Sequence, residues 1–287
     1  MDFAQELAKQ FGLQKWQTEK VIELIDGGNT IPFIARYRKE VHGSLDDQTL
    51  RELSERLEYL RSLEKRREEV AAVIGEAGAM TEELSAALGR AATLAEIEDL
   101  YRPFRPKRKT RASVAKEKGL GPLADAILAQ EKSSPEPLEL TKAYVDAEKG
   151  VETPEDALAG ALDIIAEAAS DSAAVRKRLR VVAGAQGVLV SKATKPDEDS
   201  VYAPYYEFRE AASKIAGHRV LAVNRGEKEG YLKVSLELDR AKGVDIVLSE
   251  MLRPAASPCS GAVRQACEDA YDRLIFPAIE REIRASL

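Results

Sequence analysis

Residues 44–67 read SLDDQTLRELSERLEYLRSLEKRR, and this stretch gives a clear sign of the fold class. Its leucines recur every three or four residues, as on a helix with one apolar face, and charged residues occupy the other faces. The apolar stripe consists of Leu50, Leu53, Leu57, Leu60 and Leu63. The stretch therefore predicts a long helix that begins between Ser44 and Asp47, packs through its leucines and exposes its arginines to solvent.

Helical periodicity continues through most of the first 184 residues. Further helix starts are indicated by residues whose side chains can cap a first turn, among them Thr30, Thr81, Thr93 and Thr153. A helix is also expected over residues 111–118, ending at Gly119, because glycine readily adopts the conformation that closes a helix. These signals favour a mainly α protein built as a multi-helix scaffold.

The sequence changes character after about Gly184. Residues 218–224 (HRVLAVN) and 231–238 (YLKVSLEL) are rich in strand-forming side chains, and Gly226 and Gly230 stand between them. We therefore predict a small β-hairpin near residues 218–238, whereas residues 187–190 fit either a short strand or a helix end. The predicted organisation is a helical domain over 1–184 and a small α+β segment over 185–287 with a terminal helix.

Composition and motifs argue against several classes of protein. No apolar run approaches the roughly 18 residues that span a membrane, and no G-x-S-x-G motif is present. His42 and His218 lie far apart, and Cys259 and Cys267 form no C-x-x-C pair. We expect no enzymatic activity, no cofactor and no bound metal, with two buried thiols in a reducing cytoplasm. Because the chain ends at Leu287 without a stop signal, it is expected to belong to something longer.

One segment is strongly basic although the formal net charge of the chain is −6. Between residues 102 and 118, eight lysines and arginines accompany the single acid Glu117. Charges more than about 10 Å apart are largely screened at moderate salt, so this segment can attract a polyanion by itself. Pro103 and Pro106 predict that it begins as a loop, which can follow an irregular phosphate backbone.

Arginine offers a forked donor that suits phosphate, and an aromatic ring can stack on an unpaired base. Tyr101 and Phe104 both lie among the charges. The residues predicted to bind nucleic acid are Arg102, Arg105, Lys107, Arg108, Lys109 and Arg111, with Phe104 as the stacking residue. Between four and six phosphate contacts would give a slope of log affinity against log salt of about −3 to −5.

Two other interpretations of the basic segment remain open. The segment could grip an acidic protein partner, such as a polymerase or another domain of its own chain. Alternatively its role could be structural, with Arg102 paired to Glu98 four residues earlier, the aromatic side chains anchoring the loop and the charges merely solvating it.

Two further basic groups are present. Residues 176–180 (RKRLR) lie on a predicted helix whose apolar positions are Val175, Leu179 and Val182, so a solvated basic face is favoured there. Arg36, Arg38 and Lys39 follow a glycine turn and suggest a helix-turn-helix, although no recognition helix can be identified.

Four blocks of sequence resemble the amino-terminal region of the bacterial Tex family of transcription accessory proteins, which is related to a eukaryotic transcription elongation factor. The blocks are residues 30–40 (TIPFIARYRKE), 98–112 (EDLYRPFRPKRKTRA), 115–120 (AKEKGL) and 221–227 (LAVNRGE). Their order and spacing make the resemblance specific, and it covers essentially the whole chain.

The resemblance implies a mainly helical scaffold with a helix-turn-helix-like part, a bacterial cytoplasmic setting, and a role in transcription that involves RNA or DNA. In the family the chain continues into an RNase H-like domain, helix-hairpin-helix units and a carboxy-terminal OB-fold domain, which is the module mainly associated with RNA binding. None of these is recognised in the 287 residues. The expected function is a non-enzymatic transcription accessory module that contributes to nucleic-acid binding, with a protein-docking scaffold as the alternative.

Overall fold

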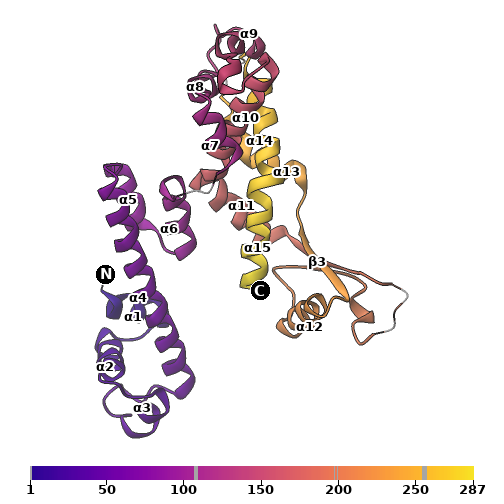
Figure 1. The fold of residues 1–287 in the computed structure, drawn as a ribbon. Helices are drawn as coiled ribbons and strands as arrows, with labels where there is room; N and C mark the ends of the chain where they lie inside the picture. Colours follow the sequence, from indigo (N-terminus) through magenta and orange to yellow (C-terminus); the bar gives the residue numbers. More distant parts are fainter. Residues whose placement is uncertain (1, 107–108, 197, 199, 254–256) are drawn as a thin grey trace. The chain divides into compact units, whose positions relative to one another are not determined.

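A computed structural model describes residues 2–106, 109–196, 198, 200–253 and 257–287 (Figure 1). The chain divides into two compact units: unit 1 ends at Tyr101, and unit 2 begins at Arg102. This division differs from the one expected near residue 184. The physical reason is that the helices before residue 184 in unit 2 share one hydrophobic core with the helices after it.

Unit 1 is built on one long helix, α4, against which α1, α2, α3, α5 and α6 all pack. Figure 1 shows α1, α2 and α3 gathered near the start of α4. The bounds are α1 (Phe3–Phe11), α2 (Lys15–Asp26), α3 (Ile31–Tyr37), α4 (Asp47–Glu76), α5 (Glu82–Arg90) and α6 (Leu94–Tyr101).

The leucine stripe of α4 forms the centre of unit 1, as the sequence predicted. Leu50, Leu53, Leu57, Leu60 and Leu63 are each at most 2% exposed. The Asp46 side chain caps the helix by accepting a 2.7 Å hydrogen bond from the backbone N–H of Thr49. The buried face thus makes α4 a helix through packing, and the cap fixes where it begins.

Unit 2 contains the remaining helices and the only strands in the described residues. Its elements are η1 (Arg102–Phe104), α7 (Arg111–Glu117), α8 (Gly121–Ala129), α9 (Pro137–Thr141), η2 (Lys142–Tyr144), η3 (Ala147–Lys149), α10 (Pro154–Asp171), α11 (Ala173–Gln186), β1 (Val188–Ala193), η4 (Ala203–Tyr205), β2 (Glu207–Ala211), α12 (Gly217–Lys228), β3 (Leu232–Glu237), α13 (Arg240–Met251), α14 (Ser260–Asp269), the π-helical η5 (Ala270–Ile275) and α15 (Phe276–Ser286). The prediction of a mainly α protein with a small β segment is confirmed.

Helix α10 lies at the centre of the helical part of unit 2, where α7, α8, α9, α11, α14 and η5 all contact it. Its apolar residues belong to the core that also includes α11 and α15. The ring of Tyr271 in η5 packs against α13 at Gly243, where an added Cβ would lie 2.3 Å from the ring. Both cysteines, Cys259 and Cys267, are free and buried in this core, as predicted.

The three strands form an antiparallel sheet in the order β2-β1-β3. The predicted strand over 231–238 is confirmed as β3, and β1 begins two residues after α11 ends, so residues 187–190 lie mostly in a strand. The predicted strand over 218–224 is wrong, because this segment lies in helix α12 (Figure 1). Strand β3 therefore pairs with β1 and not with residues 218–224, so the described residues 218–238 form no hairpin.

Packing explains why residues 217–228 are helical. Val220 and Val223 are buried three residues apart, and Gly226 follows at the same spacing against Leu232 of β3. Such spacing places all three on one face of a helix, whereas in a strand they would alternate between faces. Gly230, with φ of +81°, then ends the helix instead of forming a hairpin turn.

Candidate nucleic-acid interface

The predicted basic segment, residues 102–118, forms the beginning of unit 2. It starts in η1 and ends in α7, and both elements pack against α10. Thr110 caps α7 by accepting a 3.0 Å hydrogen bond from the N–H of Ser113, while Ser113 Oγ accepts one from the N–H of Thr110. The predicted helix over 111–118 is confirmed, and Gly119 follows it with φ of +85°.

Two carboxylates of α10 hold the two ends of this segment. Arg102 Nε donates a 3.2 Å hydrogen bond to Asp171. At the other end, Glu167 accepts a 3.0 Å bond from the Thr110 hydroxyl and lies 3.7 Å from the Lys116 ammonium. The segment is therefore fixed to the helical core at both ends, on acids separated by one turn of α10.

These contacts correct the suggestion that Arg102 pairs with Glu98. The Glu98 carboxylate instead accepts a 2.6 Å hydrogen bond from Arg66 within unit 1. Arg102 thus anchors the start of the segment through Asp171, and the nucleic-acid contact expected of it stays a prediction.

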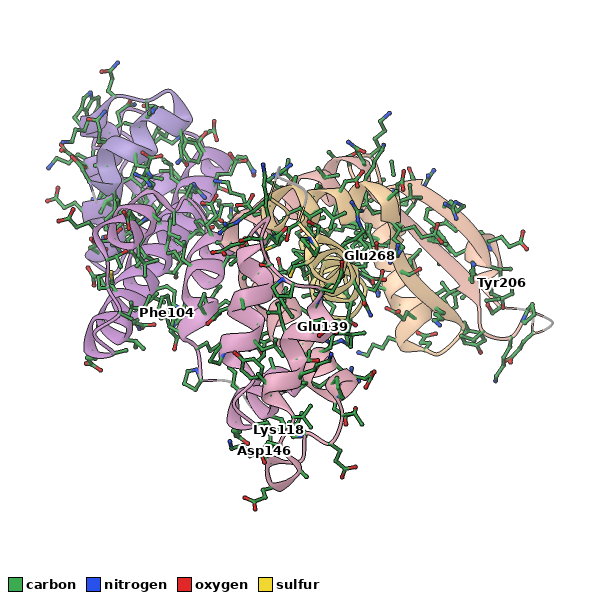
Figure 2. All side chains as sticks on the ribbon, turned by 90° about the horizontal axis from the view of Figure 1, so that it is seen from above. Phe104, Lys118, Glu139, Asp146, Tyr206 and Glu268 are labelled. Atoms are coloured by element: carbon green, nitrogen blue, oxygen red, sulfur yellow. The ribbon has the colours of Figure 1, made fainter. Side chains whose placement is uncertain are left out.

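Lys118 is also used locally. Its ammonium donates a 2.6 Å hydrogen bond to the carbonyl oxygen of Gly150. Figure 2 labels Lys118 and also Asp146, which begins the turn that contains Gly150. This lysine therefore ties the end of α7 to the chain before α10.

Two arginines of the segment form no contact within the described residues that would occupy their charge. Arg105 and Arg111 are exposed, and neither makes a hydrogen bond or ion pair with any residue that the structure describes. Lys109 lies 3.8 Å from Glu117, but both side chains are more than 60% exposed. Exposed pairs of this kind contribute little free energy, so Lys109 is free to exchange its partner for another anion.

The predicted aromatic residues are less accessible than expected of stacking platforms. Phe104 closes η1 and is half-buried; Figure 2 labels its position. Tyr101 belongs to unit 1, where its ring lies 5.4 Å from the Arg66 guanidinium. The remaining two predicted residues, Lys107 and Arg108, lie outside the described part of the chain.

A groove of about 630 Å³ runs beside α7. Its α7 side is lined by Lys109, Arg111 and Lys118, and its α10 side by Glu152, Asp156 and Asp163. Opposite charges thus face each other across the groove, which disfavours a phosphate inside it.

The second basic group, residues 176–180, behaves differently from the prediction of a solvated face. Arg176 is only 2% exposed and donates a hydrogen bond to Glu282 of α15. Arg180 binds the other oxygen of the same carboxylate, with a separation of 2.8 Å. Arg178 is exposed and donates to Ser249 of α13. This group therefore links α11 to its neighbours and offers little free charge.

Sequence reasoning missed the two acids that anchor the basic segment. Glu167 and Asp171 stand four residues apart near the end of α10 and share one helix face. That spacing was visible in the sequence, but it says nothing about which cations lie opposite. Only the packing of η1 and α7 on α10 brings them together.

Other kinds of site are not found in the described residues. No group of three or more histidine, cysteine, aspartate or glutamate side chains there is placed to hold a metal ion. Within the same residues, no helix is both long and apolar enough to cross a membrane.

Two family models match the chain. Residues 1–75 match a model described as the Tex-like protein N-terminal domain, and residues 132–286 match one described as Tex central region-like. The second match alone covers more than half of the 287 residues.

Several curated proteins are similar along the same region. The chain is 44% identical to the Bacillus subtilis protein named uncharacterized protein YdcI, over 99% of the chain and 40% of that protein. It is 37% identical to the transcriptional accessory protein Tex of Neisseria gonorrhoeae, over 83% of the chain and 31% of that protein. It is 29% identical to the human S1 RNA-binding domain-containing protein 1, over 100% of the chain and 30% of that protein. The chain thus spans well under half the length of these relatives.

Proposed function

The chain belongs to the Tex family, and from this premise we propose that it is a transcription accessory module that binds nucleic acid and catalyses no reaction. Its basic segment supplies the phosphate contacts. One relative is named a transcriptional accessory protein and another an S1 RNA-binding domain-containing protein, and these names support the proposal by analogy.

The observation that carries the proposal is the free state of Arg105 and Arg111. Other exposed or half-buried arginines of unit 2 are mostly engaged by carboxylates, as in Arg209–Glu237, Arg219–Glu210, Arg225–Glu229, Arg240–Asp272, Arg273–Asp269 and Arg284–Glu227. An arginine that forms no ion pair in the described residues keeps its full donor capacity for a phosphate. The α10 anchors hold the segment in place while leaving these two side chains available.

The decisive experiment is the salt dependence of binding to short single-stranded RNA and to duplex DNA. Each phosphate contact contributes about 0.7 to 0.9 to the slope of log affinity against log salt. The Arg105→Ala/Arg111→Ala variant should therefore reduce the magnitude of the slope by about 1 to 2. Replacing Arg105, Lys107, Arg108, Lys109 and Arg111 together by alanine should bring a larger loss.

The matched control is Arg264→Ala/Arg281→Ala. Both residues are exposed arginines of unit 2, and neither forms an ion pair within the described residues. This variant removes the same charge from a different place, so its slope should remain near that of the unmodified chain. Equal losses in the two variants would mean that net charge, and not the basic segment, governs binding.

The rival proposal is a docking scaffold that grips an acidic protein. A slope near zero for both nucleic acids, together with salt-sensitive capture of an acidic partner through Arg105 and Arg111, would favour that rival. A nuclease assay of the purified chain with and without divalent metal tests the non-enzymatic part of the proposal, because any turnover would contradict it.

We also propose a cytoplasmic location. Cys259 and Cys267 are free thiols, which a reducing compartment preserves. The measurement is cell fractionation, and a chain found only in a secreted or surface fraction would contradict this location.

A further inference from the structure

Unit 1 carries an aromatic surface that the proposed function does not use. Among the described residues, the large aromatic side chains classed as exposed are Trp16, Phe33 and Tyr37, all in unit 1. Phe33 and Tyr37 both belong to the short helix α3, where Tyr37 is 62% exposed and Phe33 is 36% exposed. Single exposed apolar residues are common, but two adjacent aromatic rings on one helix turn form a surface.

The two rings are ordered by their neighbours. Their centroids lie 5.3 Å apart, and the Arg38 guanidinium lies 5.2 Å from the centre of the Phe33 ring. Contacts of this kind restrict the rotation of each side chain before any ligand arrives, so less conformational entropy is lost on binding. Tyr37 nevertheless keeps most of its surface free for a further stacking partner.

Positive charges adjoin these rings. Arg36, Arg38 and Lys39 are exposed, and none of them has a carboxylate partner in the described residues. Glu40 is the one acid among residues 36–40, so this short stretch keeps an excess of two positive charges. Most arginines of the neighbouring helix α4 are instead engaged, as in Arg51–Asp47, Arg61–Asp26 and Arg66–Glu98.

A groove of about 670 Å³ lies between α3 and the start of α4, and Arg36 and Lys39 line it. It also contains Asp46 and Asp47, but both carboxylates already have partners. Asp46 caps α4 through the Thr49 N–H, which lowers the pKa of its carboxyl, and Asp47 accepts a 2.7 Å hydrogen bond from Arg51. The cations on the α3 side of the groove therefore remain available to an external anion.

The order of residues around α3 brings rings and cations together. Ile34 is fully buried and marks the inner side of the helix. At 3.6 residues per turn, Tyr37, Phe33 and Arg36 follow one another around the outer side. Lys39 follows the end of the helix and lines the same groove as Arg36. A stacking surface and a phosphate-binding surface are thus continuous on one exposed face.

We propose that this face of α3, together with the groove beside it, binds single-stranded RNA. An unpaired base stacks on the Tyr37 ring, while Arg36 and Lys39 contact the flanking phosphates. A duplex is a poor fit because its bases are already stacked on one another. RNA is favoured over single-stranded DNA as the ligand, because splayed bases in the loops and unpaired regions of RNA are commonly recognised by stacking on aromatic and arginine side chains. This surface belongs to unit 1, whereas the basic segment belongs to unit 2.

The test uses the full 287-residue chain and a fluorescently labelled unstructured 12-nucleotide RNA, with affinity measured by anisotropy. Tyr37→Leu keeps apolar bulk against Phe33 but removes the stacking face, and it should weaken binding by about 5- to 100-fold. Tyr37→Phe keeps the ring and should bind like the unmodified chain. Thermal unfolding of each variant checks that the fold is retained.

The charges are tested in a parallel series. Arg36→Gln/Lys39→Gln should reduce the magnitude of the salt slope by about 1. The control Lys9→Gln removes an exposed lysine of α1 that has no ion pair in the described residues, and it should leave the slope nearly unchanged. Photocrosslinking with a 4-thiouridine RNA, mapped by mass spectrometry, should label the peptide that contains residues 33–39.

The outcomes separate this inference from the proposed function. If the α3 variants bind normally while Arg105→Ala/Arg111→Ala binds weakly, the α3 surface is rejected and the basic segment stands. If the reverse holds, α3 stands and the basic segment is rejected. Tighter binding of the matching single-stranded DNA would reject RNA as the ligand, and equal binding of a duplex would reject stacking. Absence of binding to every oligonucleotide would reject both proposals.

Discussion

Two basic segments of unit 2, residues 102–118 and residues 176–180, differ in how many of their positive charges are paired with carboxylates. In the second segment, Glu282 of α15 accepts hydrogen bonds from both Arg176 and Arg180. In the first, the acids of α10 reach Arg102 and Lys116 at the ends, but not Arg105 or Arg111 in the exposed part between them. Similar runs of arginine and lysine therefore serve packing in one place and remain available for a ligand in the other.

This difference shows that the element packed opposite an arginine cluster decides whether its charges are paired or available to a ligand. Helix α11 lies against α13 and α15, so its arginines meet residues of those helices. The basic segment begins in the short 3-10 helix η1, and no acid of a neighbouring element pairs with Arg105 or Arg111 in the described residues. A functional interpretation of a basic sequence thus depends on whether a neighbouring element brings acids to it.

The largest effect should come from Glu282. Replacing Glu282 by Gln removes the negative charge beside Arg176, which is 2% exposed. Removing one carboxylate charge from beside a buried cation is costly, so the free energy of unfolding should fall by about 2–3 kcal/mol, near the low end for broken buried pairs because Glu282 itself is partly exposed. Urea denaturation followed by circular dichroism measures this loss.

Glu250→Gln is the matched control for that variant. Glu250 lies 3.8 Å from Arg178 in an exposed pair of the same basic group. Its loss should change the free energy of unfolding by less than about 0.5 kcal/mol. Equal effects of Glu250→Gln and Glu282→Gln would contradict the distinction between held and exposed arginines in this group.

A smaller effect is expected at the anchor of the basic segment. Replacing Glu167 by Ala removes the acceptor of the Thr110 hydroxyl and the partner of Lys116. The free energy of unfolding should fall by about 1 kcal/mol, the usual contribution of a hydrogen bond plus an exposed ion pair. The same urea titration measures it. Glu152 is an exposed acid that forms no ion pair in the described residues, so Glu152→Ala should change the free energy of unfolding by less than about 0.5 kcal/mol.

The smallest effect on stability is expected where the charges are free. Arg105→Ala/Arg111→Ala should leave the free energy of unfolding within about 0.5 kcal/mol of the unmodified chain, because neither side chain has a partner to lose in the described residues. Thermal and urea unfolding both report on this. Surface substitutions usually change the free energy of unfolding by no more than about 0.5 kcal/mol. A decrease of about 2 kcal/mol or more would therefore assign these arginines a structural role like that of Arg176.

Much of the helical architecture was predictable because its signals are local. The leucine stripe from Leu50 to Leu63 predicted α4, and Gly119 marked where the predicted helix over 111–118 ends. Arg105 is exposed after Pro103, and Arg111 is exposed at the start of the predicted helix over 111–118. Their binding role stays a prediction that the variants above test.

The failures came from interactions between distant segments. Residues 218–224 have strand-like composition, but Val220 and Val223 pack as one helical face on β3, and β2 takes the place beside β1. Arg102 pairs with Asp171 rather than with its sequence neighbour Glu98. In each case the partner lies in another element, so no local pattern in the sequence could identify it.

By itself the sequence determined the mainly α class, the start of the long helix and the place where positive charge is concentrated, because periodicity, capping and net charge depend on residues within one or two turns of each other. The tertiary structure alone decided that residues 217–228 are helical, that Arg176 is held by Glu282, and that Arg105 and Arg111 stay free of acids in the described part of the chain. The reason is that burial and ion pairing depend on which elements come together in space, and the free energy of packing can override local preference.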